Sequence, residues 1–139
     1  MTQDLDSPEA IDAFIDAFYA RVFEDRLLAP VFLDVAGIDP PEHLAVIKGY
    51  WRKMLLGRPD YARNMMARHE TVHGHRFLER RHFRRWLRLY RTTLARHYQG
   101  PYARRADFLA VTIAGNMQKW LHSTEGQERA RSRVAAPTI

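Results

Sequence analysis

Seven histidines give this chain most of its capacity for chemistry. They stand at positions 43, 69, 73, 75, 82, 97 and 122. An imidazole can bind a metal ion, transfer protons near neutral pH, or lie on the surface as a polar group. For any single histidine the surface role is the commonest. Whether several histidines act together depends on the helices and loops that carry them.

Zinc is one ion that closely spaced histidines can hold. His69, His73 and His75 are near enough in sequence for a fortuitous site. The chain has no cysteine, which removes a common partner ligand of zinc and also excludes disulfides, iron–sulfur clusters and a cysteine nucleophile. Zinc is therefore disfavoured.

The elements that position these residues are helices, because apolar residues recur at helical spacing in four long segments. Ser7 and Pro8 are suited to start the first, and the segments run from about 8 to 24, 40 to 56, 79 to 98 and 102 to 122. In the connection from Gly57 to Gly74, only residues 64–73 could form a short helix. Helices with apolar stripes bury them against one another, so the sequence predicts an all-α bundle.

The length predicts one domain. A chain of 139 residues with 46% hydrophobic residues can bury one core but is short for two. We expect the domain to occupy residues 1–122, and residues 123–139 to form a flexible tail because they lack an apolar pattern. No apolar run reaches the roughly 20 residues that span a bilayer. We therefore expect a cytoplasmic protein with no membrane partner.

Aromatic residues on the helices suggest another use for histidine. A porphyrin needs an apolar slot between helices, one axial nitrogen on one face and hydrogen-bond donors on the other. Tyr19 lies on the apolar side of the first helix, His43 begins a stripe that includes Ile47, and Trp86 lies in the stripe of the third long helix. Each is common in an ordinary core, but together they are compatible with a haem pocket.

Several short motifs follow one another along residues 8–122. They are Phe18-Tyr19, Pro30-Val31-Phe32, His43 with Ile47, Tyr50-Trp51, Met54-Leu55-Leu56-Gly57, Asp60-Tyr61, Asn64-Met65-Met66-Ala67-Arg68-His69 and His82-Phe83-Arg84-Arg85-Trp86-Leu87. In this combination the chain resembles the truncated haemoglobins, and best their third group, which the absence of Gly-Gly pairs also suits. The resemblance implies a two-over-two α-helical sandwich, with residues 1–122 as a truncated-globin haem domain.

The resemblance also implies roles for individual residues. His69 matches the proximal iron ligand, and Tyr19, His43 and Trp86 match the distal ligand-binding residues. The residues expected to line the haem pocket are Phe32, Ile47, Tyr50, Trp51, Met54, Met66 and Phe83. The segment Val72-His73-Gly74-His75-Arg76 is longer than in the shortest members, which permits an alignment with His73 as the ligand. His69 is favoured because the Asn64-Met65-Met66 lead-in fits it.

The cofactor implied is haem b, iron protoporphyrin IX, and the expected ligands are dioxygen, nitric oxide or peroxide. Dioxygen bound to ferrous haem carries partial negative charge, so donors at Tyr19 and Trp86 would slow its release. Slow release argues against oxygen storage and favours redox chemistry, with peroxidase-like or nitric oxide detoxifying activity served by an unidentified reductase.

The alternative is a basic helical module that binds nucleic acid, or an interaction module without a cofactor. The net charge is +6, and arginines crowd the third long helix and the residues before it, at positions 76, 80, 81, 84, 85, 88 and 91. Trp86 or Tyr90 could stack on bases. Both belong to the apolar stripe, however, and no nucleic-acid recognition motif accompanies them, so nucleic acid is an unfavoured partner.

Overall fold

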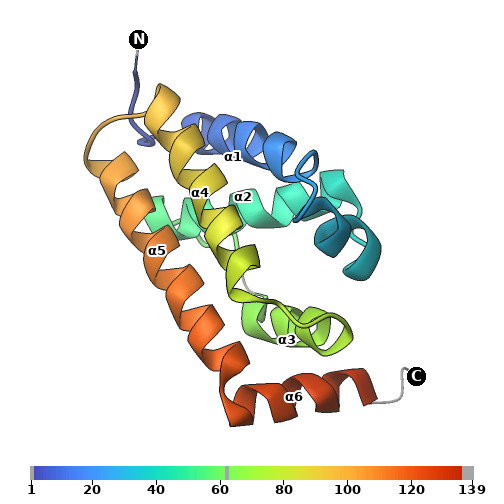
Figure 1. The fold of residues 1–139 in the computed structure, drawn as a ribbon. Coiled ribbons are helices and arrows are strands. Elements are labelled where there is room, and N and C mark those ends of the chain that lie inside the picture. Colours follow the sequence, from blue (N-terminus) through green and yellow to red (C-terminus); the bar gives the residue numbers. More distant parts are fainter. Residues whose placement is uncertain (1, 62, 136–139) are drawn as a thin grey trace.

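The computed structural model describes residues 2–61 and 63–135, and this part of the chain is predominantly helical (Figure 1). The long helices are α1 (Pro8–Val22), α2 (Pro40–Leu56), α4 (Arg80–His97) and α5 (Pro101–His122). The shorter elements are the π-helical segment η1 (Val31–Val35) and the helices α3 (Met65–His75) and α6 (Thr124–Ala135). The predicted all-α class is confirmed.

The helix ends follow from local backbone chemistry. Ser7 Oγ accepts a hydrogen bond from the backbone N–H of Ala10 at 3.1 Å and begins α1. α2 ends at Gly57, which adopts a φ of 73° that favours glycine. Asn64 Oδ1 accepts from the backbone N–H of Ala67 at 3.0 Å and begins α3. The structure confirms the predicted bounds of the four long helices to within about two residues.

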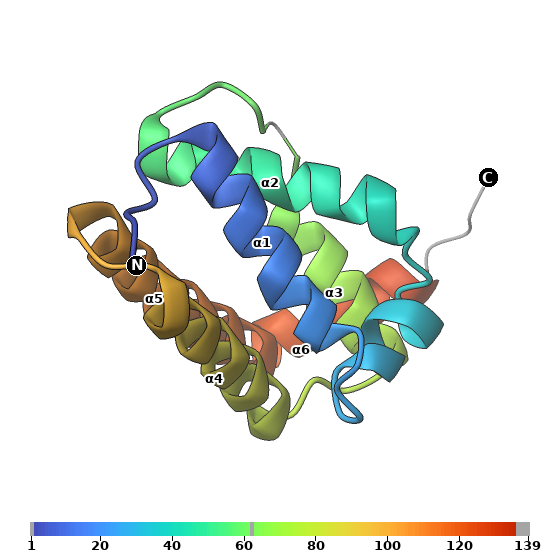
Figure 2. The same ribbon diagram turned by 90° about the horizontal axis from the view of Figure 1, so that it is seen from above.

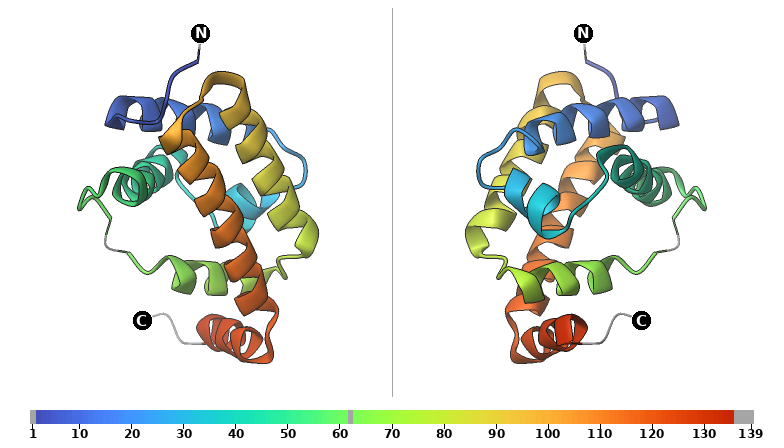
Figure 3. Two further views of the ribbon diagram at one scale, coloured as in Figure 1. Left: turned by 90° about the vertical axis from the view of Figure 1, so that its left-hand side faces the viewer. Right: turned by 90° about the vertical axis from the view of Figure 1, so that its right-hand side faces the viewer.

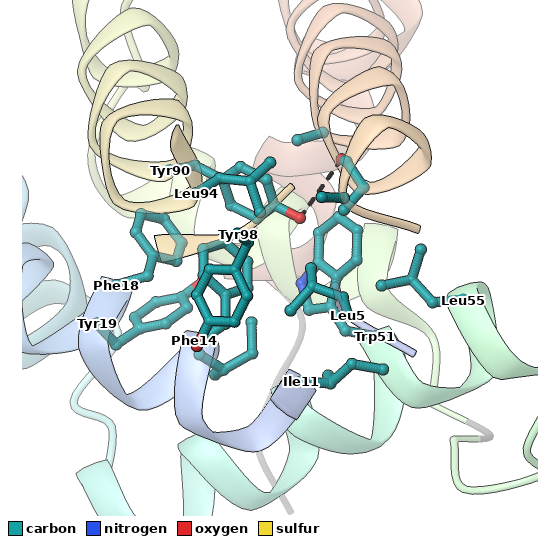
Figure 4. Packing of buried hydrophobic residues seen from close by; sticks show 14 of the residues in the cluster. Leu5, Ile11, Phe14, Phe18, Tyr19, Trp51, Leu55, Tyr90, Leu94 and Tyr98 are labelled. Carbon is teal, nitrogen blue, oxygen red and sulfur yellow. Dashed lines mark hydrogen bonds between the residues drawn. The ribbon is translucent and has the colours of Figure 1, made fainter. Parts of the chain in front are cut away.

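Two helix pairs form the sandwich. α1 packs on α2 and α4 packs on α5, and the pairs meet where α1 crosses α4 and α2 crosses α5 (Figure 1, Figure 2). Between them lies a core rich in aromatic rings, in which Phe14 and Phe18 of α1 pack edge-on against Tyr90 of α4 (Figure 4). This arrangement is the expected two-over-two sandwich.

α3 occupies a separate position. It contacts η1, α5 and α6, but no Cα atom of α2 lies within 8 Å of one in α3, where both helices are fully described. Figure 3 shows α3 set apart from α2, with α6 running along its other side. α3, the helix that carries His69, is therefore supported by contacts with α5 and α6, and its backbone does not approach that of α2.

The prediction of a flexible tail at residues 123–139 is wrong for residues 124–135, which form α6; residues 136–139 lie outside the described part of the chain. Small residues replace the missing apolar stripe, because Gly126 and Ala130 are buried and allow a close approach to the neighbouring helices. A Cβ added at Gly74 of α3 would clash with the carbonyl oxygen of Ala130.

Candidate functional site

His69 lies on α3 with its ring held in one tautomer. Its Nδ1 is 2.8 Å from the carbonyl oxygen of Met65, one turn earlier. A carbonyl can only accept, so Nδ1 carries the proton and Nε2 keeps a lone pair. Burial lowers the pKa of His69, which favours the neutral ring. A neutral imidazole oriented through Nδ1 is the form that ligates a metal through Nε2.

His43 of α2 is a second imidazole of the same site. Burial is the main cause that lowers the pKa of His43 to about 4, and electrostatic interactions with His69 and Arg68 lower it further. His43 and His69 are therefore close enough to interact. His43 Nε2 is buried and has no hydrogen-bond partner among the described residues. Nε2 of His73 and of His82 is buried without a partner in the same way, so this observation makes His43 Nε2 available to a bound group without distinguishing it from those two atoms.

Tyr19 of α1 brings a hydroxyl group into the same region. Its ring centroid lies 6.1 Å from that of His43 and 5.9 Å from that of Phe32. Trp86 Nε1 of α4 donates a hydrogen bond to the Tyr19 hydroxyl oxygen at 3.3 Å. Burial raises the pKa of Tyr19 to about 12, so the phenol keeps its proton. Among the described residues no acceptor takes that proton, which leaves Tyr19 O–H free to donate.

The expected pocket residues divide into three groups. Phe32 packs on His43 at 5.7 Å and belongs with Met66 and Phe83 to an apolar cluster beside α3, while Ile47 packs on the main core from α2. Trp51 is buried in the main core against Tyr90, and Tyr50 packs on Trp51 and Tyr61. Met54 is half-buried on α2.

These side chains fit the expected haem. The site combines a neutral imidazole with a free Nε2, apolar residues from three elements, an orphaned imidazole nitrogen and a phenolic donor. Such a set is what a flat apolar group with an electrophilic centre needs. The backbones of α2 and α3 do not approach each other within 8 Å between Cα atoms, so side chains make up whatever contact these two helices have.

His73 has different surroundings from His69. Its Nδ1 accepts a hydrogen bond from the backbone N–H of Leu78 at 2.9 Å, so in the neutral ring Nε2 carries the proton. The ring packs 4.6 Å from Phe77 and 5.9 Å from His122. To ligate through Nε2, His73 would have to change tautomer and lose the Leu78 bond. His75 is exposed.

The expectation that zinc is disfavoured rests partly on the lack of a His-Glu-x-x-His run, and this is wrong: the chain contains His69-Glu70-Thr71-Val72-His73. This run reads His-Glu-x-x-His, a zinc signature in which the glutamate is a general base. Here Glu70 is buried and accepts bonds from Trp120 Nε1 at 2.7 Å and Arg133 Nε at 3.0 Å, so its carboxylate is already engaged. No group of three metal-binding side chains occurs within residues 2–61 and 63–135.

Glu70 is itself a residue whose role the sequence did not reveal. A glutamate followed by a polar residue on a weakly amphipathic helix looks solvent-exposed, yet its side chain is only 4% exposed. The partner Arg133 is 63 residues away on α6. No local pattern could have indicated this pair, because it depends on where α6 packs.

The basic helix does not favour base stacking. Tyr90 is completely buried, and Trp86 is partly buried against Phe18 and Tyr90, so neither ring faces outward. Four of the seven arginines form ion pairs: Arg85 with Asp25 and Arg91 with Asp107, each at 2.7 Å, and both Arg76 and Arg81 with Glu79. In the described residues, no helix is long and apolar enough to cross a membrane.

Comparisons with known proteins gave a consistent result. No protein-family model matches the chain. The chain is 28% identical over 121 residues to the group 3 truncated hemoglobin ctb of Campylobacter jejuni, covering 85% of this chain and 93% of that protein. The crystal structure of the group III truncated hemoglobin from Campylobacter jejuni superposes with a TM-score of 0.79 and 27% identity, covering 88% of this chain and 97% of that one.

Proposed function

The chain belongs to group III of the truncated haemoglobins, and we propose that it binds haem b through His69 and holds diatomic ligands beside Tyr19. When bound, the haem supplies an iron that takes dioxygen, nitric oxide or peroxide and places negative charge on the bound ligand. The residues of this chain decide how long that ligand stays and what happens to it.

His69 would hold the iron, and its hydrogen bond to Met65 supports this role. The Nδ1–H···O bond fixes the ring plane and directs Nε2 away from the α3 backbone. Met66, Phe83 and Phe32 supply apolar surface next to it. Because only the neutral ring can ligate, we expect the iron–His69 bond to weaken in acid.

Tyr19 would be the principal donor to the ligand. Its O–H has no acceptor among the described residues, whereas Trp86 N–H is already directed to the Tyr19 oxygen. Trp86 thus fixes the hydroxyl and, by donating to it, makes it a better donor. His43, neutral near pH 7 because its pKa is about 4, can donate or accept through Nε2 without bringing a charge into the pocket.

A pocket of this kind suits redox chemistry on the ligand better than oxygen storage. Donors that slow oxygen release make delivery inefficient, while the same donors stabilise charge that develops on oxygen, nitric oxide or peroxide during reaction. Turnover as a peroxidase or a nitric oxide dioxygenase would need an electron donor such as a reductase.

The observation that carries this proposal is the 3.3 Å contact between Trp86 Nε1 and the Tyr19 hydroxyl oxygen. A hydrogen bond to a charged partner contributes about 1.5–3 kcal/mol, so Tyr19→Phe should raise the oxygen dissociation rate by roughly 10- to 100-fold. Trp86→Phe should raise it less, since Tyr19 remains. Stopped-flow displacement of oxygen by carbon monoxide measures both rates. Unchanged dissociation in Tyr19→Phe would contradict the assignment of this donor.

A further inference from the structure

A continuous series of oxidisable rings leads from the candidate site towards the surface. Trp86 stacks on Tyr90 with centroids 5.3 Å apart, and Tyr90 lies 5.2 Å from Trp51. Trp51 lies 5.4 Å from Tyr50, which lies 5.2 Å from Tyr61. Every member is a tryptophan or a tyrosine, the side chains that lose a single electron most readily among the aromatic residues.

From Trp86 the series leads away from the candidate site only through Tyr90, because the other oxidisable ring that Trp86 contacts, Tyr19, belongs to the site itself. On the other side of Tyr90 the neighbouring rings are Phe14 and Phe18, and Tyr98 is reached only across Phe14. A phenylalanine ring is too hard to oxidise to serve as a stage in electron transfer. Figure 4 shows Trp51 and Tyr90 in the same part of the core, with Tyr98 close to Phe14. Tyr61 is partly exposed, as Trp86 and Tyr50 also are, and it is the last member of the series counted from the candidate site.

The rings differ in whether they can lose an electron and remain oxidised. A tyrosine must release its phenolic proton to do so, and a tyrosine that cannot release it only connects its neighbours. Tyr90 directs its hydroxyl to the carbonyl oxygen of Ala106 at 3.4 Å, and a carbonyl is a poor base. A buried phenol that cannot release its proton resists oxidation, so Tyr90 acts as a bridge. Indole tolerates the loss of an electron without losing a proton, which makes Trp86 and Trp51 the internal stages.

Tyr61 differs from the buried phenols in its surroundings. Burial raises its pKa, and the positive charges of Arg68 and Arg63 oppose that rise. Its partial exposure allows water to take the phenolic proton when the ring is oxidised. An electron vacancy that arises near Trp86 is therefore most stable on Tyr61.

We propose that Trp86, Trp51 and Tyr61 carry one electron from the protein surface to the haem site when hydrogen peroxide reacts there. Reduction of hydrogen peroxide to two water molecules consumes two electrons and two protons; a bound haem would supply one of the electrons, and Trp86 would supply the other. Trp51 then reduces Trp86 across Tyr90, and Tyr61 reduces Trp51 by way of Tyr50, releasing its proton to water. Tyr61 becomes the site at which an external one-electron reductant acts twice: the first electron refills Tyr61, and the second would pass along the same rings to the haem site. This inference rests on the proposed haem binding.

The test is to add hydrogen peroxide to the ferric haem-loaded protein with a nitroso spin trap and to map the labelled residues by mass spectrometry. The parent protein should be labelled at Tyr61. Tyr61→Phe should abolish labelling at position 61, and Trp51→Phe should prevent it from reaching Tyr61. The matched control is Tyr102→Phe, because Tyr102 is also exposed but lies outside the series; it should leave the Tyr61 label unchanged.

The haem spectrum separates the two possible failures. If the chain takes up no haem, the proposed function and this inference both fall. If haem binds and its spectrum responds to peroxide, but Tyr61 of the parent is unlabelled, only the electron route is overturned. Labelling of Tyr61 that persists in Trp51→Phe, with an unchanged haem spectrum, would also overturn it. Tyr61 is partly exposed, so the Tyr61→Phe result does not depend on repacking the core.

Discussion

Arg133 of α6 donates a hydrogen bond from Nε to Oε1 of Glu70 at 3.0 Å, and so joins the C-terminal helix to the residue that follows His69. Trp120 of α5 donates to the other carboxylate oxygen at 2.7 Å. A carboxylate this deeply buried needs both donors, because an unpaired charge in the interior is costly. The position of His69, the proposed iron ligand, therefore depends on a helix that the apolar pattern did not predict.

The substitution Arg133→Gln tests this connection. It removes one charged donor from the buried Glu70 and should cost about 1–3 kcal/mol of unfolding free energy. Transfer of haem to an excess of apomyoglobin should also become faster, because α3 is less firmly held. The control is Arg129→Gln, which removes the same charge from α6 but no bond to Glu70. Equal effects of the two substitutions would show that the loss of charge matters and the Glu70 contact does not.

Gly74 and Gly115 form a matched pair for testing the α3–α6 contact. A Cβ at Gly74 would meet the Ala130 backbone, whereas one at Gly115 meets nothing within 4 Å. Gly115→Ala should stabilise α5 by about 0.5–1 kcal/mol through lower backbone entropy in the unfolded chain. Gly74→Ala should destabilise the protein despite the same chemical change. The measurement is the midpoint temperature of thermal unfolding of both variants. A higher midpoint for Gly74→Ala than for the parent would contradict the close packing of α6 on α3.

Acid should destabilise the protein through His73 and His82. Nδ1 of His73 accepts a hydrogen bond from the backbone N–H of Leu78, and Nδ1 of His82 accepts one from that of Glu79, both at 2.9 Å. Protonation of either ring would put a proton on Nδ1 and break that hydrogen bond. Burial is the main cause that lowers both pKa values below the ordinary 6.5. The unfolded chain then binds more protons than the folded one, so stability is full above about pH 6.5 and falls below it.

The measurement is the urea midpoint at about pH 7.5 and pH 5. The midpoint should fall in acid, and it should fall less in His82→Gln, whose amide oxygen can accept the Glu79 N–H but does not titrate. His97→Gln is the control, because His97 is exposed. If His82→Gln lost as much stability in acid as the parent, His82 would not contribute to the acid sensitivity.

We propose that His43 controls ligand entry, since its buried Nε2 is unpartnered and its ring packs against both Phe32 and Tyr19. His43→Leu should change the rate of carbon monoxide association measured after flash photolysis, and the apoprotein should become more stable because an unsatisfied polar atom is removed. If carbon monoxide bound His43→Leu at the parental rate, His43 would have no role in ligand entry and would only be part of the first turn of α2.

The sequence was sufficient for the long helices because each has a cap and an apolar stripe. Ser7, Gly57 and Gly100 mark ends that local chemistry determines, and these ends were predicted closely. α6 was missed because its packing uses Gly126, Ala130 and the ion pair to Glu70, none of which produces helical periodicity of apolar residues.

The candidate site was only partly accessible from sequence. Family resemblance singled out Tyr19, His43 and Trp86, but the bond from Trp86 to Tyr19 joins residues 67 apart and follows only from the crossing of α1 and α4. The choice between His69 and His73 remained open for the same reason. It depends on which ring nitrogen each backbone contact occupies, and spacing along the chain does not reveal that.

The central claim is that His69 holds the iron of a bound haem. The most direct test is to titrate the apoprotein with haemin and record the ferric, ferrous and carbonyl spectra of the parent, His69→Gly and His73→Gly. We predict stoichiometric uptake by the parent and by His73→Gly, and loss of the histidine-ligated spectrum in His69→Gly that added imidazole restores. A parent that takes up no haem, or a His69→Gly variant with the parental spectrum, would contradict the claim.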